Sequence, residues 1–598
     1  MCGIFGQLYQ PIKNFPATKL ALEVRGRDNF GRYTNQDIDF LHARLAIIGL
    51  GEQGNGPMIS ADKRYVLTYN GEIYNYKTLR EEIFKQGFHF QSMTDTEVLL
   101  NGFICYGEKI FNLIEGIYAF ALWDCVEKRL YLGVDPFGIK PIYYGVKTIH
   151  TDGVEKRAWV FSSQIRPIVE SKFFETLKID SNGVESYLMS GSVQGEATIF
   201  ESIRTIRPGN IYKIDNRGMH KIFEPKQFLC DSTKIVESLS LPKLKEKIIS
   251  VVEQELMSEV PLGLFLSGGI DSSILALIMR KFGPVMAFSL GVESVQANKL
   301  AKKLDIKHYQ YYLTQSDFND SIQDFILSID HPSIDGFNSY WVSKLASKNV
   351  KVALSGLGAD EIFAGYPIFH HAYQWEKNRI PGLGYLPFGA LSRMNLLKYA
   401  QNFSPKYFIE TYSKYRKIDQ KKKIQFLQEE NNSSWPLLSQ ISLLEKNHYL
   451  FSMLLRDMDS LSMRHQVEVR VPFLNWDLWN SLLHLNNETK CETLTHHRMN
   501  KPLLVRAFQQ EFEDIGFGAE FLALSKDKKK GFELPIGRWG KELFLSKAKE
   551  MKDFCATIGI DNKHYTMGYN KFLKDENNYR ILWSYFVLME YYKSFFPI

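Results

Sequence analysis

The sequence has few cysteines, and none of them falls in a disulfide or metal-binding pattern. Its 598 residues include six cysteines, without a Cys-x-x-Cys pair or a regular spacing. Neither a disulfide framework nor a zinc knuckle is supported, and we expect a reducing compartment. The chain also lacks a basic start with an apolar core, and it has no apolar run of about 20 residues that would span a bilayer. We therefore expect a cytoplasmic protein.

The sequence also has little excess of either sign of charge. The formal net charge is +6, and the one basic block is Lys528 to Lys530, which we interpret as a solvated loop. The Gly-x-Ser-x-Gly and His-Glu-x-x-His motifs are absent, so a serine hydrolase or a zincin loses its main support. The expected partners are small-molecule substrates, without nucleic acid or membrane. The sequence leaves open whether the protein forms a homodimer.

The length and the 45% apolar content predict at least two domains. The first 215 residues alternate short β-type runs with Gly and Asn, and two helical stretches, 76–86 and 95–106, interrupt them. This pattern predicts an α+β domain with antiparallel sheets at 1–215. Residues 216–240 have weak periodicity, and we expect them to be a linker before a second domain at 241–598.

The second domain changes character. Strand-like runs at 262–266, 285–290, 309–313 and 350–354 alternate with helical stretches at 295–304 and 318–329. This alternation predicts an α/β domain with an open parallel sheet, whose ligands bind at the carboxyl ends of the strands. Beyond about Tyr366 the pattern is mainly helical.

Cys2 is a candidate nucleophile. If Met1 is removed, Cys2 carries a thiol and a free α-amine on one residue. The amine has an ordinary pKa of about 7.7 to 8.0 and the thiol about 8.5, so the amine can take the thiol proton near neutrality. Position alone favours the other interpretation, that Cys2 is a small buried residue near a chain start.

The surrounding motifs favour the catalytic reading. The runs MCGIFG at 1–6, RLAII at 44–48, NGEIYN at 70–75 and TDTE at 94–97 occur in this order. Together they resemble the glutaminase domain of class II glutamine amidotransferases, which implies an Ntn-hydrolase-like αββα sandwich with Cys2 as nucleophile. The resemblance implies that Asn70 and Gly71 form an oxyanion hole. It also implies a glutamine site formed by Arg44, Ile47, Ile48, Asn70, Gly71, Glu72 and Asp95.

Chemistry agrees with these roles. The planar guanidinium of Arg44 suits the glutamine α-carboxylate, and Asp95 with Glu72 suits the α-ammonium. Two positions depart from the family pattern: Arg27 stands in place of proline, and Gln164 stands in place of the usual glutamate. We expect both to affect communication between sites, not the chemistry itself.

A phosphate-binding loop follows the first strand of the second domain. The run SGGIDSS at 267–273 lies between a buried strand and an amphipathic helix, where backbone N–H groups, hydroxyls and the helix dipole favour an anion. It lacks the Gly-Lys-Ser/Thr of a Walker A loop, so γ-phosphate transfer is not favoured.

Three further runs extend the match to most of the chain. VPLGLFL at 260–266, SGLGADEIFAGY at 355–366 and EVRVPFL at 468–474 are similar to the ATP-pyrophosphatase domain of glutamine-hydrolysing asparagine synthetases, an adenine nucleotide alpha hydrolase-like fold. The resemblance implies carboxylate adenylation by ATP, then amidation by ammonia, with Lys501 and Glu468 as catalytic residues. The implied ATP site is Leu266, Ser267, Gly268, Gly269, Asp271, Ser272, Leu290, Ser355 and Gly356. Asp271 and Asp360 suit Mg²⁺.

One departure bears on the acceptor. Asparagine synthetases usually have glutamate where this chain has Leu357, and leucine cannot do acid–base work. Aspartate is the first acceptor hypothesis, and a uronic-acid sugar of a surface polysaccharide is the alternative. Cys2 counts against a β-lactam-forming synthetase, and a scaffold protein would not keep both sets of catalytic residues.

Overall fold

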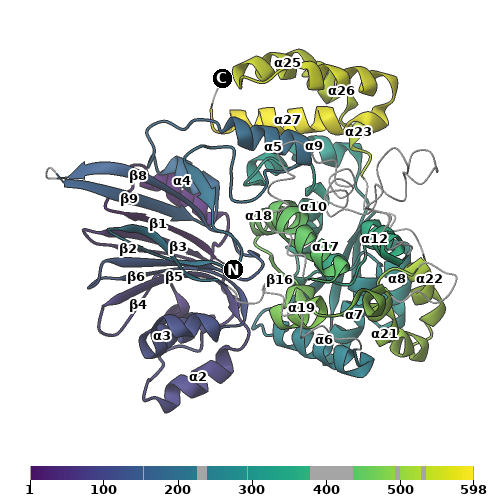
Figure 1. Cartoon of the computed structure of the whole chain (residues 1–598), viewed down its shortest axis with the longest axis horizontal. Helices are drawn as coiled ribbons and strands as arrows, with labels where there is room; N and C mark the ends of the chain where they lie inside the picture. The colour runs from purple at the N-terminus through teal and green to yellow at the C-terminus, as the bar shows by residue number, and fades with distance from the viewer. Residues whose placement is uncertain are drawn as a thin grey trace, which may run out of the picture.

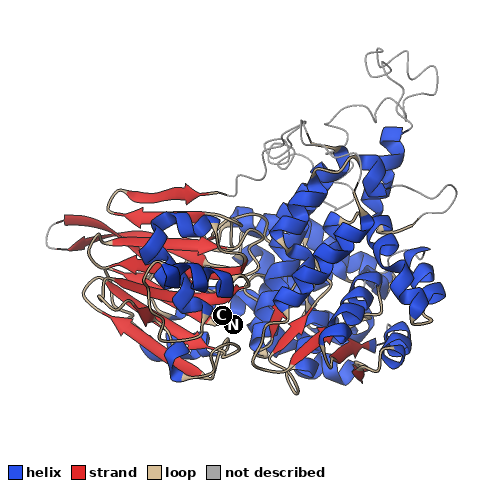
Figure 2. Cartoon of the chain, turned by 90° about the horizontal axis from the view of Figure 1, so that it is seen from below, coloured by secondary structure: helices blue, strands red, loops and turns tan. Residues whose placement is uncertain are grey.

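The computed structural model describes residues 2–151, 154–224, 239–291, 294–377, 435–491, 499–526 and 534–596. A β-rich part and a helix-rich part lie side by side (Figure 1), and the strands of the two parts form separate sheets (Figure 2). Within the described ranges, no helix has the length and apolar character needed to cross a membrane.

The N-terminal part is a sandwich of two six-stranded antiparallel sheets. In spatial order, the first sheet contains β10 (Ile203–Thr205), β8 (Tyr143–Thr151), β9 (Val154–Ser162), β1 (Gly3–Leu8), β3 (Ile38–Arg44) and β2 (Asn29–Thr34). The second contains β12 (Gly218–Phe223), β11 (Ile211–Asp215), β7 (Arg129–Val134), β6 (Gly116–Asp124), β5 (Tyr65–Ile73) and β4 (Met58–Ile59). The two sheets enclose a core that includes Ile4, Phe40, Val66, Trp123 and Phe161.

Helices cover both outer faces of the sandwich. α1 (Phe15–Glu23) and α4 (Ile165–Glu170) pack on the first sheet, and α2 (Tyr76–Lys85) and α3 (Asp95–Tyr106) pack near the second. Thr94 caps α3, since its side chain accepts a hydrogen bond from the Glu97 N–H. Short helical segments are η1 (Glu52–Gly54) and η2 (Gly107–Asn112), and α5 (Ser181–Ser190) follows. The four layers confirm the expected αββα sandwich.

The expected linker at 216–240 is wrong in its first part. Gly218–Phe223 forms β12, which pairs with β11 at the edge of the second sheet. Asp215 and Gly218 pair at the turn between them, so β11 and β12 form a hairpin. The polar side chains of this strand face solvent, which explains its weak hydrophobic pattern. Residues 225–238 lie outside the described residues.

The second part is built on a five-stranded parallel sheet. In spatial order its strands are β15 (Lys307–Tyr311), β14 (Met286–Leu290), β13 (Leu262–Phe265), β16 (Val352–Leu354) and β17 (Glu468–Arg470). The first four confirm the expected strands. β17 was not expected, because three residues with two charged side chains carry no strand pattern.

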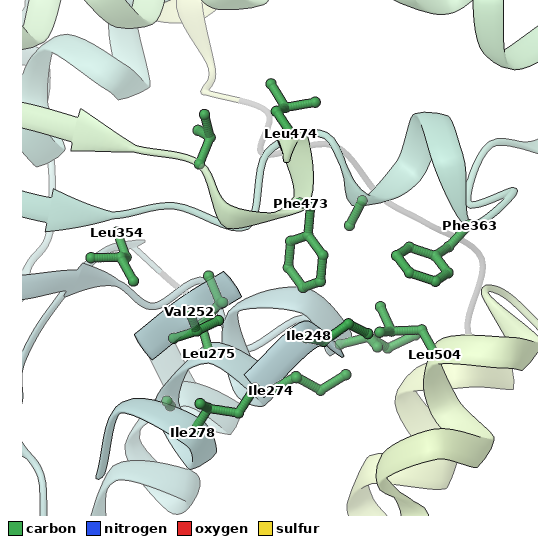
Figure 3. Packing of buried hydrophobic residues seen from close by; sticks show 14 of the residues in the cluster. Ile248, Val252, Ile274, Leu275, Ile278, Leu354, Phe363, Phe473, Leu474 and Leu504 are labelled. Atoms are coloured by element: carbon green, nitrogen blue, oxygen red, sulfur yellow. The ribbon is translucent and has the colours of Figure 1, made fainter. Parts of the chain in front are cut away.

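Helices pack on this sheet as the alternation predicts. They are α6 (Leu241–Glu255), α7 (Ile270–Phe282), α8 (Ser294–Lys303), α9 (Gln315–Ser328) and α10 (Phe337–Ala346). Ile274 and Ile278 of α7 join Ile248 and Val252 of α6 and Leu354 of β16 in one buried cluster (Figure 3). The core thus fixes α7, whose first turn faces the loop after β13.

The remaining described chain is mainly helical, as expected. It contains α11 (Ala359–Ile362), α12 (Pro367–Lys377), α17 (Leu437–Glu445), the π-helical η8 (Lys446–Leu455), α18 (Arg456–Arg464), η9 (Pro472–Leu474), α19 (Trp476–Leu483), α20 (Asn487–Cys491), α21 (Pro502–Asp514), α22 (Gly518–Lys526), α23 (Ile536–Trp539), α24 (Lys541–Ser546), α25 (Ala548–Thr557), α26 (Lys563–Lys574), η10 (Glu576–Asn578) and α27 (Arg580–Lys593). α27 packs on α5 and α9, so the end of the chain shares a core with the sandwich (Figure 1).

Candidate active sites

Cys2 lies just before β1, next to the end of β5. Its backbone N–H donates to Asn70 Oδ1 at 2.8 Å. The Asn70 side chain is fully buried, and its Nδ2 has no hydrogen-bond partner among the described residues. An unpaired buried donor is costly unless a ligand satisfies it. This unpaired donor beside Cys2 is what an oxyanion hole requires, and the expected role of Asn70 stays a prediction.

Gly71 is required by close packing between β5 and β6. A Cβ atom at this position would lie 2.1 Å from the Ile117 carbonyl oxygen. Any side chain at this position would therefore clash with β6. Burial, the largest cause, raises the pKa of the Cys2 thiol, while a hydrogen bond at Leu45 and the charge of Arg44 act in the opposite direction.

We expect Asn70→Ala to lower kcat for glutamine hydrolysis by about 10² to 10³, because one oxyanion donor is lost. Asn75→Ala is the matched control, because Asn75 donates to the Leu113 carbonyl and lies outside the pair of Cys2 and Asn70. Steady-state glutaminase assays of both variants check this. An unchanged kcat in Asn70→Ala would remove Asn70 from the site.

Arg44 holds the loop after β3 in this structure. Its guanidinium donates to the carbonyls of Ile48, Gly49 and Gly51 and to Asn55 Oδ1. Ile47 packs in a small buried cluster with Val352 and Met463 of the second part. A glutamine carboxylate at Arg44 would replace some of these loop contacts, so the expected role of Arg44 stays a prediction.

Asp95 and Glu72 lie in the same buried region. Asp95 Oδ2 accepts from Tyr69 Oη at 2.8 Å and from the Ile73 N–H at 2.9 Å, so it fixes the end of β5. Glu72 Oε1 lies 3.7 Å from Arg470 Nη2. Burial raises the pKa of Glu72, and the negative charges of Asp95 and Glu468 add to this rise.

The second site is a cavity of about 730 Å³ at the carboxyl ends of β13, β14 and β16. All the residues expected to bind ATP or metal line it, namely Leu266, Ser267, Gly268, Gly269, Asp271, Ser272, Leu290, Ser355, Gly356 and Asp360. The α7 N-terminus opens into the cavity, and the hydroxyls of Ser267 and Ser272 lie 3.1 Å apart. This geometry suits a phosphate chain.

Lys501 joins the two acidic residues of the cavity. Its ammonium contacts Asp271 Oδ2 and lies 2.8 Å from Asp360 Oδ1. Burial acts to lower the pKa of Lys501, but the two carboxylates outweigh it and raise the pKa. Among the described residues, no group of three or more His, Cys, Asp or Glu side chains could hold a metal. Two carboxylates nevertheless fit Mg²⁺, which is commonly bound by one or two carboxylates together with substrate phosphates.

Glu468 is not among the residues that line this cavity, and its expected catalytic role stays a prediction. It belongs to β17 and lies 2.6 Å from Arg470 Nε, with both side chains fully buried. Arg470 contacts Glu72 of the sandwich, so both residues lie on the glutaminase side of the sheet. Although burial acts to raise the pKa of Glu468, the positive charges of Arg470, the chain's amino terminus and Lys140 together lower it. Leu357, in contrast, lines the cavity.

The sequence motifs missed an ion pair that joins the two sites. Arg25 Nε donates to the Cys2 carbonyl at 3.1 Å. Its Nη1 and Nη2 donate to Asp459 of α18 at 2.8 and 3.1 Å, and both side chains are fully buried. Lys140 Nζ lies 3.7 Å from the same carboxylate. More than 430 positions separate Arg25 from Asp459, so no local pattern indicates this contact.

Two protein-family models match this chain, one in each of its two parts. Residues 1–227 match the glutamine amidotransferase domain, and residues 243–553 match the asparagine synthase domain. The chain belongs to the asparagine synthase family. This confirms the resemblance drawn from the motifs.

Several curated relatives are similar over much of their length. Asparagine synthetase [glutamine-hydrolyzing] 1 of Bacillus subtilis is 28% identical over 94% of this chain and 91% of its own. A putative asparagine synthetase [glutamine-hydrolyzing] 2 of Methanocaldococcus jannaschii is 31% identical over 63% of this chain and 78% of its own. Among solved structures, a glutamine phosphoribosylpyrophosphate amidotransferase of B. subtilis covers 54% of this chain and 92% of its own, at 14% identity and a TM-score of 0.30.

Proposed function

We propose that this family member is a glutamine-hydrolysing asparagine synthetase, a carbon–nitrogen ligase. The observation that carries the proposal is the presence in one chain of two joined sites: Cys2 beside the unpaired donor of Asn70, and the phosphate-type cavity with Lys501. The relatives' names support aspartate as acceptor. The products of the proposed reaction are asparagine, glutamate, AMP and pyrophosphate.

The first half-reaction uses the sandwich. The Cys2 thiol attacks the glutamine amide carbon, and its proton passes to the α-amine freed by loss of Met1 and then to the amide nitrogen, which leaves as ammonia while the thioester forms. Water then attacks the thioester, which releases glutamate and returns the proton to the Cys2 sulfur. Asn70 Nδ2 and the Gly71 N–H stabilise the tetrahedral oxyanion. Asp95 and Glu72 hold the glutamine ammonium, and Arg44 with the loop at Ile47 and Ile48 holds its carboxylate.

The second half-reaction uses the cavity. The loop at 267–272 and the start of α7 hold the phosphates of ATP, while Leu266, Leu290, Ser355 and Gly356 surround the nucleotide. Lys501 stabilises the charge that develops as the acceptor carboxylate attacks the α-phosphate. Asp271 and Asp360 would hold Mg²⁺, which neutralises phosphate charge when bound.

Ammonia must travel between these sites without mixing with water, where it would be protonated. The buried interface supports such a passage, since Arg25, Lys140, Asp459, Glu468 and Arg470 are all nearly inaccessible to solvent. Glu468 lies in this interface, paired with Arg470. The proposed location is the cytoplasm, where these substrates occur. The proposed glutaminase domain ends after β12.

An assay of AMP release tests the proposal. Purified enzyme receives glutamine, ATP and Mg²⁺ with either aspartate or a uronic-acid sugar, and a parallel reaction omits the acceptor. We expect AMP and asparagine with aspartate alone. AMP release with the sugar but not with aspartate would overturn the acceptor, and no AMP under any condition would overturn the enzyme class.

A further inference from the structure

Helix α18 separates the two proposed sites. Asp457 and Met458, in its first turn, line the cavity. Asp459 points to the sandwich, where it binds Arg25 beside Cys2. Arg456 donates to the Val193 carbonyl at 2.9 Å, in the segment after α5. Helix α18 thus contacts Arg25 next to Cys2 on one side and the cavity on the other.

Asp457 is the carboxyl group of helix α18 that lines the cavity. Its side chain is 5% exposed, and Ser333 Oγ donates to its Oδ2 at 2.6 Å, which fixes its orientation. Burial raises the pKa of Asp457, and the neighbouring Asp335 raises it further, while Ser333 and Arg456 act to lower it.

The other acidic residues of the cavity are less suited to accept a proton from nitrogen. Asp271 and Asp360 are ion-paired with Lys501. Asp335 Oδ1 accepts the Gly336 N–H at 2.8 Å, at the start of α10. Leu357 lines the same cavity but has no ionisable group. Asp457 is thus buried, held in one orientation by Ser333, and located on the helix that lies between the two proposed sites.

We propose that Asp457 is the catalytic base of the amidation step, an inference that rests on the proposed function. Ammonia attacks the acyl carbon of the adenylate, and a C–N bond forms. The tetrahedral intermediate then loses one proton from nitrogen to the Asp457 carboxylate. Its C–O bond to the phosphate breaks, AMP leaves with that electron pair, and the amide remains.

The test separates adenylation from amidation. Asp457→Asn is supplied with ammonium chloride, ATP, Mg²⁺ and aspartate, so the glutaminase site is bypassed. We expect a stoichiometric burst of pyrophosphate, followed by amide formation slowed by about 10² to 10⁴ because a general base is missing. Asp457→Glu should recover part of the rate. Asp477→Asn, at an exposed carboxyl that does not line the cavity, is the control and should leave the amidation rate unchanged.

Three outcomes would overturn the inference. Amide formation at the wild-type rate would do so, as would an equal loss of pyrophosphate burst and amide, or a rise confined to KM for aspartate. Should Asp457→Asn fail to fold, Ser333→Ala keeps the carboxyl and removes a contact that lowers its pKa. The amidation rate of Ser333→Ala should then rise with pH over a higher range than in wild type, and an unshifted profile would overturn the inference.

These results are distinguishable from failure of the proposed function. If wild-type enzyme releases no AMP with aspartate and ammonia, the function itself fails. If wild type is active and Asp457→Asn matches it, only the role of Asp457 fails.

Discussion

Replacing Cys2 with alanine is expected to abolish glutamine hydrolysis while leaving amide synthesis from ammonium chloride intact. The change removes the nucleophile but not the donor at Asn70. Because ammonia enters the second half-reaction directly, adenylation at the cavity does not need Cys2. Glutaminase activity is measured as glutamate release, and synthetase activity as AMP release with each nitrogen source.

Cys105→Ala is the matched control for this variant. Cys105 is another partly buried free cysteine of the sandwich, on α3 away from Asn70. Its glutaminase activity should match wild type. Undiminished glutamine turnover in Cys2→Ala, or loss of ammonia-dependent synthesis in that variant, would contradict the assignment of separate sites.

Asp459→Ala is expected to destabilise the protein by at least about 3 to 5 kcal/mol, because removing one partner of a buried ion pair leaves an uncompensated charge. Here the guanidinium of Arg25 loses both of its hydrogen bonds to Asp459, and Lys140 loses its nearby carboxylate. Since Arg25 also donates to the Cys2 carbonyl, the glutaminase site should lose its geometry as well. Denaturant unfolding followed by fluorescence measures the stability.

Glu576→Ala provides a surface comparison for Asp459→Ala. Glu576 pairs with Lys541 at 3.2 Å, and both side chains are substantially exposed. An exposed pair of this kind is worth about 0 to 1 kcal/mol, so its loss should scarcely change stability. Equal destabilisation by the two substitutions would show that burial of the Arg25–Asp459 pair has no special effect.

Short-range patterns predicted the local pieces well. The Gly-rich run at 267–269 follows a strand and precedes α7, as the motif indicates, and Asp271 faces the cavity from the first turn of that helix. The αββα layers and the parallel order of the first four strands also agree with expectation. The edge strand β12 was missed because one face is solvated, and β17 because its charged side chains are paired inside the fold.

The placement of Glu468 and Asp457 shows where sequence reasoning stops. Glu468 belongs to a recognisable motif, yet it lies with Arg470 against Glu72, away from the cavity that the motif suggested. Asp457 lies outside the motifs and still lines that cavity. Neighbouring residues on a strand or helix face different sides, so a short shift along the chain decides which site a side chain reaches.

The sequence by itself determined the two chemistries, because a nucleophile next to its oxyanion donors and a phosphate loop at a helix start depend on residue types and local backbone. Only the tertiary structure decided how the sites meet. Arg25 binds Asp459 and Glu72 approaches Arg470 because folding brings distant segments into one buried interface, where charges must find partners. That pairing depends on distances in space, which spacing along a chain does not encode.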